Sequence, residues 1–352
     1  MTIIHAHRAL AVGGWIDAVS IEVGAGGRID GVRQGGTASG HPLLLPGMPN
    51  AHSHAFQRAL AGRTEQAGQA RGTFLSWREQ MYALAVRLAP ADIEAIATLL
   101  YVEMLEAGYT SVCEFHYLHH GPGGRPHGEP AAASRALLRA ARAAGIRLTL
   151  LPVLYMHAGF GAQPPEPAQA PFISSVREYL ALLETLRRDE DELTRIGIAF
   201  HSLRAVAPGP MAEVLAWRAA VAPDMPVHIH VAEQLQEVHE CEAWSGLRPV
   251  EWLLDRGFVD AGWCLVHATH MTEDETRWLA ATGAVACLCR TTEANLGDGV
   301  FPLPAFLAAG GRIAVGSDSQ VSVSPVEELR ALEYGQRLVH GQRNIGASPA
   351  EP

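Results

Sequence analysis

The sequence predicts an α/β protein: a (β/α)8 TIM-like barrel preceded by a small β appendage. After residue 43, eight apolar, β-rich runs alternate with amphipathic helical runs, which is the element order of such a barrel. The apolar runs are continuous, as strands buried on both faces are. The 352 residues are 48% hydrophobic and 18% charged, so the chain can bury a large core. A doubly wound open sheet is the alternative, but neither GxGxxG nor GxxxxGK(S/T) occurs to bind a nucleotide phosphate.

The predicted elements follow in chain order. Residues 1–42 form the small β portion, in which residues 18–23 partly alternate and the GAGG and QGG stretches supply turns. The barrel, residues 43–352, has predicted strands at 43–49, 109–115, 146–155, 195–200, 226–231, 263–267, 284–289 and 312–317. Its predicted helices are 92–107, 131–144, 173–188, 211–220, 249–255, 273–281, 303–309 and 326–338.

Local signals mark two helix starts and two long loops. The capping boxes are Thr272 with Glu275, and Ser324 with Glu327 behind Pro325. Long inserts follow the first and third strands, at residues 55–89 and 157–171. Because the loops that follow the strands form the catalytic face of a barrel, these inserts are expected on that face.

Composition excludes several function classes. The formal net charge of −10 argues against a nucleic-acid or anionic-membrane surface, and no apolar run approaches the roughly 18 residues of a membrane span. The 5 Cys include no CxxC, and the N-terminus lacks a signal-peptide pattern, so we expect a cytoplasmic protein. All 27 basic residues are Arg, which excludes a Schiff-base lysine, a P-loop lysine and a lysine that bridges metal ions.

Polar residues recur where predicted strands end. They are His52 and His54 after the first strand, His228, His230 and Glu233 at the fifth, His267 and His270 at the sixth, and Asp318 at the eighth. A barrel brings these ends around one opening. A lone His on an apolar strand is usually a satisfied core residue, but recurrence at the same end of four strands favours a metal site.

Three imidazoles and one carboxylate suit Zn²⁺ with a position left for water. His52 and His54 lie two residues apart and therefore point to the same side of the strand. Either His228 or His230 could be the third His ligand. We favour His230 because Glu233 follows it at the strand exit, and we expect Asp318 to complete the set.

Four motifs resemble the amidohydrolase superfamily, whose barrels are metal-dependent hydrolases: HSH at 52–54, HVAE at 230–233, VH at 266–267 and GSD at 316–318. Members with two metals bridge them through a carbamylated lysine, which this chain cannot supply. Its HxxE motif is similar to the one-metal aminohydrolase branch. Within that branch, LPGMPNAHSHAFQRALAG, LPVLYMHAGFGAQPP and FHSLRAV resemble the N-formimino-L-glutamate deiminases of histidine degradation.

The resemblance implies hydrolysis of N-formimino-L-glutamate to N-formyl-L-glutamate and ammonia, with one Zn²⁺ per chain. It implies that Asp318 and His267 orient the attacking water and accept its proton, while Glu233 moves protons to the imine nitrogen and the departing ammonia. It also implies a set of residues that hold the substrate: Gln57, Arg78, Tyr117, His201 and Arg204. Two arginines fit a substrate with two carboxylates, because guanidinium binds carboxylate in a bidentate manner.

Two other functions remain open. A deaminase of guanine, cytosine or adenosine-type rings would need an apolar slot, and a non-catalytic scaffold would usually have lost ligands. As partners we expect a small dicarboxylate and a second copy in a homodimer, but neither nucleic acid nor membrane. The further His at 116–120 are expected to be loop surface rather than a second metal site. The family pattern returns to complete the small β domain after the eighth strand, whereas this sequence ends at Pro352, so the appendage is expected to be incomplete, with an open edge.

Overall fold

A computed structural model describes residues 1–35, 40–65 and 74–346 of the chain. It contains two compact units, Met1–Met48 and Pro49–Pro352. Part of the first long insert, residues 66–73, lies outside the described residues. In the described part, no helix combines the length and apolar character that crossing a membrane requires.

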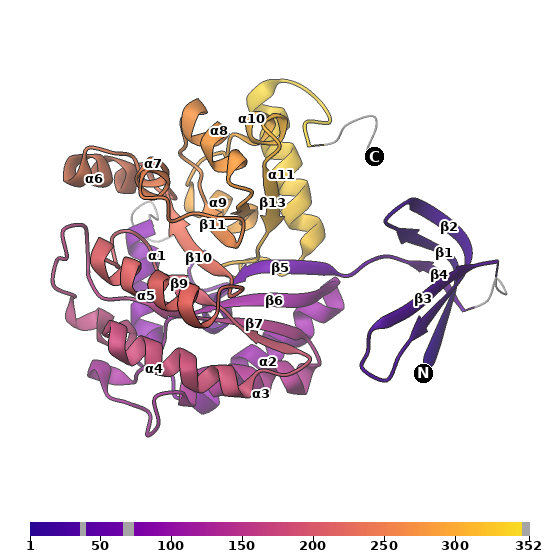
Figure 1. The fold of residues 1–352 in the computed structure, drawn as a ribbon, viewed down its shortest axis with the longest axis horizontal. Helices are drawn as coiled ribbons and strands as arrows, with labels where there is room; N and C mark the ends of the chain where they lie inside the picture. Colours follow the sequence, from indigo (N-terminus) through magenta and orange to yellow (C-terminus); the bar gives the residue numbers. More distant parts are fainter. Residues whose placement is uncertain (36–39, 66–73, 347–352) are drawn as a thin grey trace. The chain divides into compact units, whose positions relative to one another are not determined.

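The N-terminal unit is a four-stranded sheet, which confirms the expected small β appendage. Its strands are β1 (Thr2–Ala11), β2 (Gly14–Val23), β3 (Ile29–Gln34) and β4 (His41–Leu44), in the order β3-β2-β1-β4 (Figure 1). Strands β1, β2 and β3 form an antiparallel meander, and β4 pairs with β1 in parallel.

The second unit is a nearly closed parallel barrel, which confirms the predicted fold class and excludes the doubly wound sheet. The sheet order is β13-β12-β11-β10-β9-β7-β6-β5, and β8 also pairs with β7. Its strands are β5 (Met48–Ser53), β6 (Tyr109–His116), β7 (Arg147–Leu154), β8 (Thr194–Ile196), β9 (Ile198–Phe200), β10 (Val227–Val231), β11 (Trp263–His267), β12 (Val285–Leu288) and β13 (Arg312–Val315).

Closure occurs where β5 meets the segment after β13. Ser53 and Asp318 form a parallel bridge. The His54 N–H donates to the Asp318 carbonyl at 3.1 Å, and the Asp318 N–H donates to the His52 carbonyl at 3.0 Å. The residues that close the barrel therefore include ones that the sequence predicted to be metal ligands.

Helices surround the strands on the outside (Figure 1). The α-helices are α1 (Phe74–Ala85), α2 (Pro90–Ala107), α3 (Ala132–Ala144), α4 (Val176–Leu186), α5 (Pro208–Val221), α6 (Leu235–Ser245), α7 (Pro249–Asp255), α8 (Glu273–Ala281), α9 (Arg290–Leu296), α10 (Leu303–Ala308) and α11 (Pro325–His340). Short 3-10 helices are η1 (Ala55–Leu60), η2 (Pro122–Gly124), η3 (Pro167–Phe172) and η4 (Arg187–Asp189). Every side chain of β10 and β11 is buried, because the core packs on one face and helices on the other.

The prediction of a first barrel strand at 43–49 was wrong in its bounds. The apolar run there straddles two strands: Leu43 and Leu44 end β4 of the small sheet, and the barrel strand β5 starts at Met48. Leu43 is 47% exposed and Leu45 is 59% exposed, so this run is not core. Strand β5 reads MPNAHS, a half-polar sequence that gives no apolar signal.

The predicted fourth strand is divided into β8 and β9 at Gly197. The Gly197 N–H still donates to the Leu150 carbonyl of β7 at 2.9 Å. A Cβ at position 197 would lie 2.5 Å from Leu151 Cδ2 and 3.1 Å from the Pro226 carbonyl oxygen, so a larger residue would require these neighbours to shift.

One capping box is confirmed and the other is only half formed. Thr272 Oγ1 accepts from the Glu275 N–H at 3.1 Å, and the Glu275 carboxylate accepts from the Thr272 N–H at 2.8 Å. Ser324 Oγ accepts from the Glu327 N–H at 3.3 Å, but the Glu327 carboxylate accepts from the Ser322 hydroxyl instead of returning the bond.

Candidate active site

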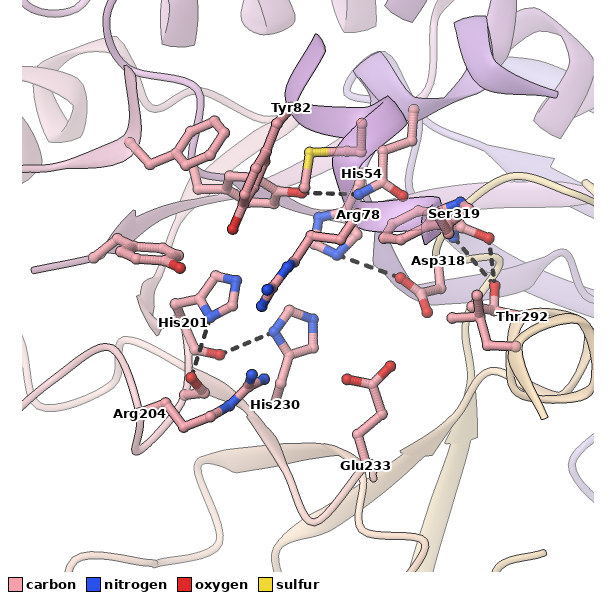
Figure 2. A pocket seen from close by; sticks show the side chains of 18 of the residues that line it. His54, Arg78, Tyr82, His201, Arg204, His230, Glu233, Thr292, Asp318 and Ser319 are labelled. Carbon is pink, nitrogen blue, oxygen red and sulfur yellow. Dashed lines mark hydrogen bonds and ion pairs between the residues drawn. The ribbon is translucent and has the colours of Figure 1, made fainter. Parts of the chain in front are cut away.

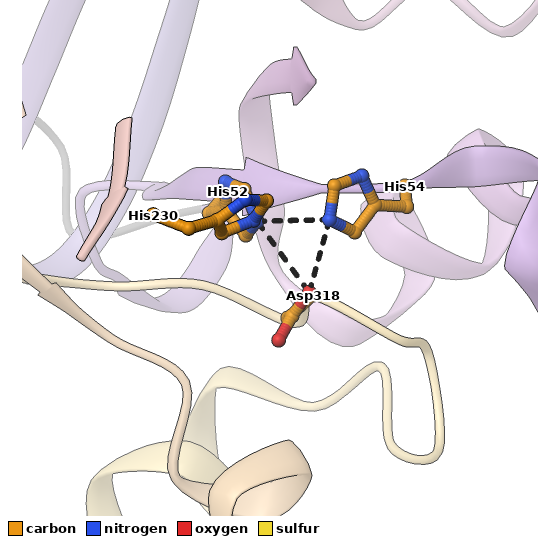
Figure 3. Close-up of side chains that lie close together, drawn as sticks. All are labelled: His52, His54, His230 and Asp318. Carbon is orange, nitrogen blue, oxygen red and sulfur yellow. Dashed lines mark hydrogen bonds and ion pairs between the residues drawn. The ribbon is translucent and has the colours of Figure 1, made fainter. Parts of the chain in front are cut away.

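Four buried side chains form a group able to hold a metal ion: His52 and His54 at the end of β5, His230 in β10 and Asp318 after β13 (Figure 3). Their ligand atoms all lie within 4.8 Å of one another. His52 Nε2 is 3.1 Å from His54 Nε2 and 3.0 Å from His230 Nε2. Asp318 Oδ1 lies 3.4 Å from His52 Nε2 and 3.3 Å from His54 Nε2.

Backbone carbonyls orient two of these rings. His54 Nδ1 donates to the Phe115 carbonyl at 2.8 Å, and His230 Nδ1 donates to the His201 carbonyl at 2.9 Å. These bonds assign the proton to Nδ1, so both Nε2 lone pairs face the centre of the group. Burial, followed by neighbouring imidazoles, holds the pKa of His52 and of His230 well below the usual value, so the rings are neutral.

The group therefore concentrates lone pairs and one carboxylate in a buried space, which a cation would stabilise. His230 lies in the group, whereas His228, two residues earlier on β10, does not. The sequence favoured His230 over His228, and it is His230 that lies within this group.

Glu233 and His267 lie beside the metal group. His267 Nε2 is 3.8 Å from Glu233 Oε1 and 3.8 Å from Asp318 Oδ2. On the other side of the ring, His267 Nδ1 is 3.2 Å from Glu293 Oε1 of α9. Burial lowers the pKa of His267, but Glu233, Glu293 and Asp318 outweigh it and raise the pKa to about 10. Burial raises the pKa of Glu233 to about 7, near the value expected of a group that exchanges protons at neutral pH.

The pocket beside these groups also contains the five residues expected to hold substrate (Figure 2): Gln57, Arg78, Tyr117, His201 and Arg204. Figure 2 shows the guanidinium groups of Arg78, from α1, and Arg204, which follows β9, reaching toward the same space near His230. Burial lowers the pKa of Arg204, but Glu237, Tyr155 and Glu233 reverse the effect and raise it, so this arginine is cationic.

Two of the expected residues contact each other across the pocket wall. Gln57 Nε2 donates to the Tyr117 hydroxyl at 2.9 Å, and that hydroxyl faces Met81 Sδ at 3.7 Å. The His201 ring lies 4.4 Å from the Tyr155 ring, centroid to centroid, and 5.3 Å from the ring of His230.

Sequence reasoning missed several residues of the site. Tyr155 follows β7, and its place at a strand end could have identified it. Tyr82 of α1 also lines the pocket, and Arg78 Cζ lies 5.8 Å from its ring centroid. Glu293 and Glu237 come from helices after strands, where no motif marks them.

The expectation that residues 116–120 are loop surface was wrong for two of their His. His116 is 2% exposed and His119 is 4% exposed. His119 Nε2 is bonded to the Val153 carbonyl of β7 at 2.9 Å, so it fixes the loop to the barrel.

Comparison with known proteins agrees with this geometry. The family model described as "Amidohydrolase family" matches residues 43–351, and that described as "Formimidoylglutamate deiminase HutF, N-terminal domain" matches residues 1–41. The chain is 54% identical over 349 residues to the formimidoylglutamate deiminase of Pseudomonas aeruginosa, an alignment that covers 98% of this chain and 76% of that protein.

Two solved structures show the same architecture. An amidohydrolase from Brucella melitensis superposes with a TM-score of 0.93 at 47% identity, over 99% of this chain and 78% of that one. An adenosine deaminase from Xanthomonas campestris, solved with bound zinc, superposes with a TM-score of 0.77 over 97% of this chain and 74% of that one. At 22% identity, this second likeness concerns the fold alone.

Proposed function

Because the chain belongs to the amidohydrolase family, we propose that it is a formimidoylglutamate deiminase, which hydrolyses N-formimino-L-glutamate to N-formyl-L-glutamate and ammonia. The observation that carries the proposal is the pairing of two arginines with a buried metal group in one pocket. A dicarboxylate amidine needs both: cations for its carboxylates and an electrophilic centre for its C=N bond.

The metal in this proposal is one Zn²⁺ per chain, held by His52, His54, His230 and Asp318. Three neutral nitrogen donors and a carboxylate are a typical zinc set. When bound, the ion supplies Lewis-acid chemistry that lowers the pKa of a water from ~15.7 toward ~7. The absence of lysine from the sequence agrees with a single ion, since no carbamylated lysine can bridge a second one.

Arg78 and Arg204 bind the two carboxylates of the substrate in this proposal. Both guanidinium groups reach the pocket, and each can form two parallel hydrogen bonds to a carboxylate. Gln57, Tyr117 and His201 line the pocket near His54 and His230, where they can orient the formimino group. A planar nucleobase has no carboxylates for the two arginines to bind, which disfavours a ring deaminase.

Glu233 carries the protons of the reaction. In its acid form it gives its proton to the imine nitrogen as water attacks the formimino carbon. It then takes the proton of the intermediate's hydroxyl and passes it to the same nitrogen, so that the C–N bond breaks, the C=O bond forms and ammonia leaves. The proton that Asp318 took from water restores the acid form of Glu233. The surrounding carboxylates raise the pKa of His267, so its ring is protonated and cannot accept a proton from water. We therefore assign orientation of the attacking water to His267 and acceptance of the water's proton to Asp318. Glu293 fixes the His267 ring from behind.

The test measures ammonia release and metal content on one preparation. We expect turnover of N-formimino-L-glutamate, no turnover of adenosine, guanine or cytosine, and one zinc per chain. Turnover of a nucleobase without turnover of formiminoglutamate would replace this function with a ring deaminase, and no turnover of any of them by metal-loaded protein would favour a scaffold. Homodimer formation and a cytoplasmic location stay predictions, the first testable by the mass of the native particle.

A further inference from the structure

Glu237 is a buried carboxylate for which the proposed reaction has no direct use. It lies on the first turn of α6, which starts two residues after Glu233, and it is 2% exposed. A carboxylate in such a place is costly unless it is hydrogen-bonded or paired. The hydrogen bonds that its carboxylate accepts therefore indicate its role.

Both oxygens of Glu237 bind the turn that carries Glu233. Oε1 accepts from the Ala232 N–H at 3.2 Å, and Oε2 accepts from the Glu233 N–H at 3.2 Å. Consecutive N–H groups beside a left-handed residue form a concave anion-binding nest. Here the anion is supplied by the chain itself, four residues beyond Glu233.

The turn needs this support because its backbone is strained. Ala232 has φ of 50°, in the left-handed region that a residue with a Cβ rarely adopts. The backbone bond from the His270 N–H to the Ala232 carbonyl, at 3.1 Å, holds one side of the turn. The carboxylate of Glu237 holds the other.

The Glu233 side chain depends on this turn for its direction. In the described part of the chain its carboxylate accepts no hydrogen bond, and its ion-pair contact with His267 is long, at 3.8 Å. Its aim is therefore set by the backbone from which it projects. A shift of about 1 Å in a reacting group can cost on the order of 100-fold in rate.

We propose that Glu237 is a positioning residue, which fixes the left-handed turn at Ala232 and thereby aims the carboxylate of Glu233 at the substrate. The proposal rests on the proposed function for the role of Glu233. Glu237 also lies near Arg204, whose charge offsets part of the cost of burying the carboxylate. It thus links the turn that carries Glu233 to an arginine of the pocket.

The test compares Glu237→Gln with Glu240→Gln. Glutamine keeps the size of Glu237 but offers one acceptor oxygen, so it can satisfy only one of the two N–H groups. Glu240 is the matched control, because it is an exposed carboxylate on the same helix that also acts on the charge of Arg204 but does not touch the turn. Each variant is assayed for kcat, KM, bound metal, thermal stability and the Kd of the product N-formyl-L-glutamate.

We expect Glu237→Gln to lower kcat by about 10- to 100-fold, with KM and the product Kd within about threefold of the parent and metal content unchanged. Glu240→Gln should retain the parental kcat. A kcat within twofold of the parent, an equal loss in Glu240→Gln, or a loss that follows the loss of metal would each overturn the proposal.

A second variant keeps the test decisive if Glu237→Gln is unstable. Adding Ala232→Gly removes the Cβ that opposes the left-handed turn, so the double variant Ala232→Gly with Glu237→Gln should fold. Its kcat should be at least threefold higher than that of Glu237→Gln. If Glu237→Gln alone cannot be purified, the double variant should reach at least a tenth of the parental kcat. A double variant below these limits would show that Glu237 acts other than through the turn. The parent is assayed first: its failure to release ammonia from formiminoglutamate contradicts the proposed function, whereas a loss confined to Glu237 variants concerns Glu237 alone.

Discussion

Glu233 combines burial, a pKa raised to about 7 by that burial, and a place beside the metal group without belonging to it. We expect Glu233→Gln to keep its metal and lose most of its turnover, by roughly 10²–10⁴-fold in kcat. Glutamine has the same length but cannot carry a proton from water to the leaving nitrogen. Steady-state ammonia release and metal analysis on the same sample measure both effects. Activity within a few-fold of the parent would remove Glu233 from the mechanism.

In the proposed function, substrate specificity depends on Arg78 and Arg204, which both line the pocket. Losing a charged hydrogen bond costs about 1.5–3 kcal/mol, so Arg78→Met and Arg204→Met should each lower kcat/KM roughly tenfold to over a hundredfold. Metal content should not change, and replacement by Lys should rescue poorly because a point charge cannot form the paired bonds. Arg63→Met, an exposed arginine of the same insert as Arg78, is the control.

The decisive comparison for the two arginines uses a second substrate. For a formimino compound that lacks one carboxylate, one of the two variants should have the same kcat/KM as the parent, because the substrate carboxylate that this arginine would bind is already absent. Equal, small losses on both substrates in both variants would contradict the assignment of the pocket and favour a neutral ring substrate.

At the residue scale, the sequence predicted the part of the site that lies at strand ends. His52, His54, His230 and Asp318 could be grouped because parallel strands in a barrel end at the same opening. Glu293 could not, because it reaches His267 from a helix 26 positions further along the chain. Glu237 lies only four positions after Glu233, but no motif marks a side chain that binds the backbone N–H groups of a turn.

At the scale of elements, the predicted bounds of helices and strands were most accurate where the local sequence pattern was strong. The bounds of β11, α7 and α8 agree with the sequence prediction: β11 is a short buried run, α7 starts at a proline, and α8 starts after a capping box. Helices α1, α6 and α9 were not predicted. Helix α1 lies within the long insert at 55–89, and α6 and α9 start shortly after strand ends with polar sequences that resemble loops. Strand β5 was misplaced because its buried positions include Asn50 and His52 rather than a run of apolar side chains.

Glu114 connects β6 to the segment that carries the first two metal ligands. Oε2 accepts from the Ser53 hydroxyl at 2.7 Å, and Oε1 accepts from the Ala55 N–H at 2.6 Å. Burial raises the pKa of Glu114 from 4.5 to about 8. A carboxyl with a raised pKa stabilises the fold fully below its unfolded value of 4.5, and this contribution is lost as the pH rises through about 8.

The Glu114→Gln variant should therefore lose less stability than the parent as the pH rises. The amide keeps an acceptor for Ala55 and cannot ionise, so the Tm of the parent should fall relative to that of the variant as the pH rises from about 5 to about 8. Thermal melts of both proteins across that range, at one zinc concentration, measure the difference. Parallel Tm curves would show that Glu114 keeps the same protonation state in the folded and unfolded protein.

At the scale of the whole molecule, the metal group lies where the barrel closes. His52 lies on β5, His54 directly follows it, Asp318 follows β13, and the Ser53–Asp318 bridge joins these two ends. His230 reaches the group from β10 on another side of the barrel. An ion held by all four therefore ties the first strand of the barrel to the last and to a third, and it cancels the repulsion among lone pairs and a carboxylate.

Metal removal should consequently destabilise the barrel as well as abolish turnover. A ligand at 100 times its Kd stabilises the folded state by about 2.7 kcal/mol, so chelation should lower Tm by about 5 °C or more, and added Zn²⁺ should restore both Tm and activity. Asp318→Asn, with one ligand weakened, should start from a lower Tm and respond less to chelator. Metal analysis during the titration should show one ion lost per chain. A chelated protein that contains no metal yet melts at the parental temperature would show that the four residues hold the barrel closed without the ion.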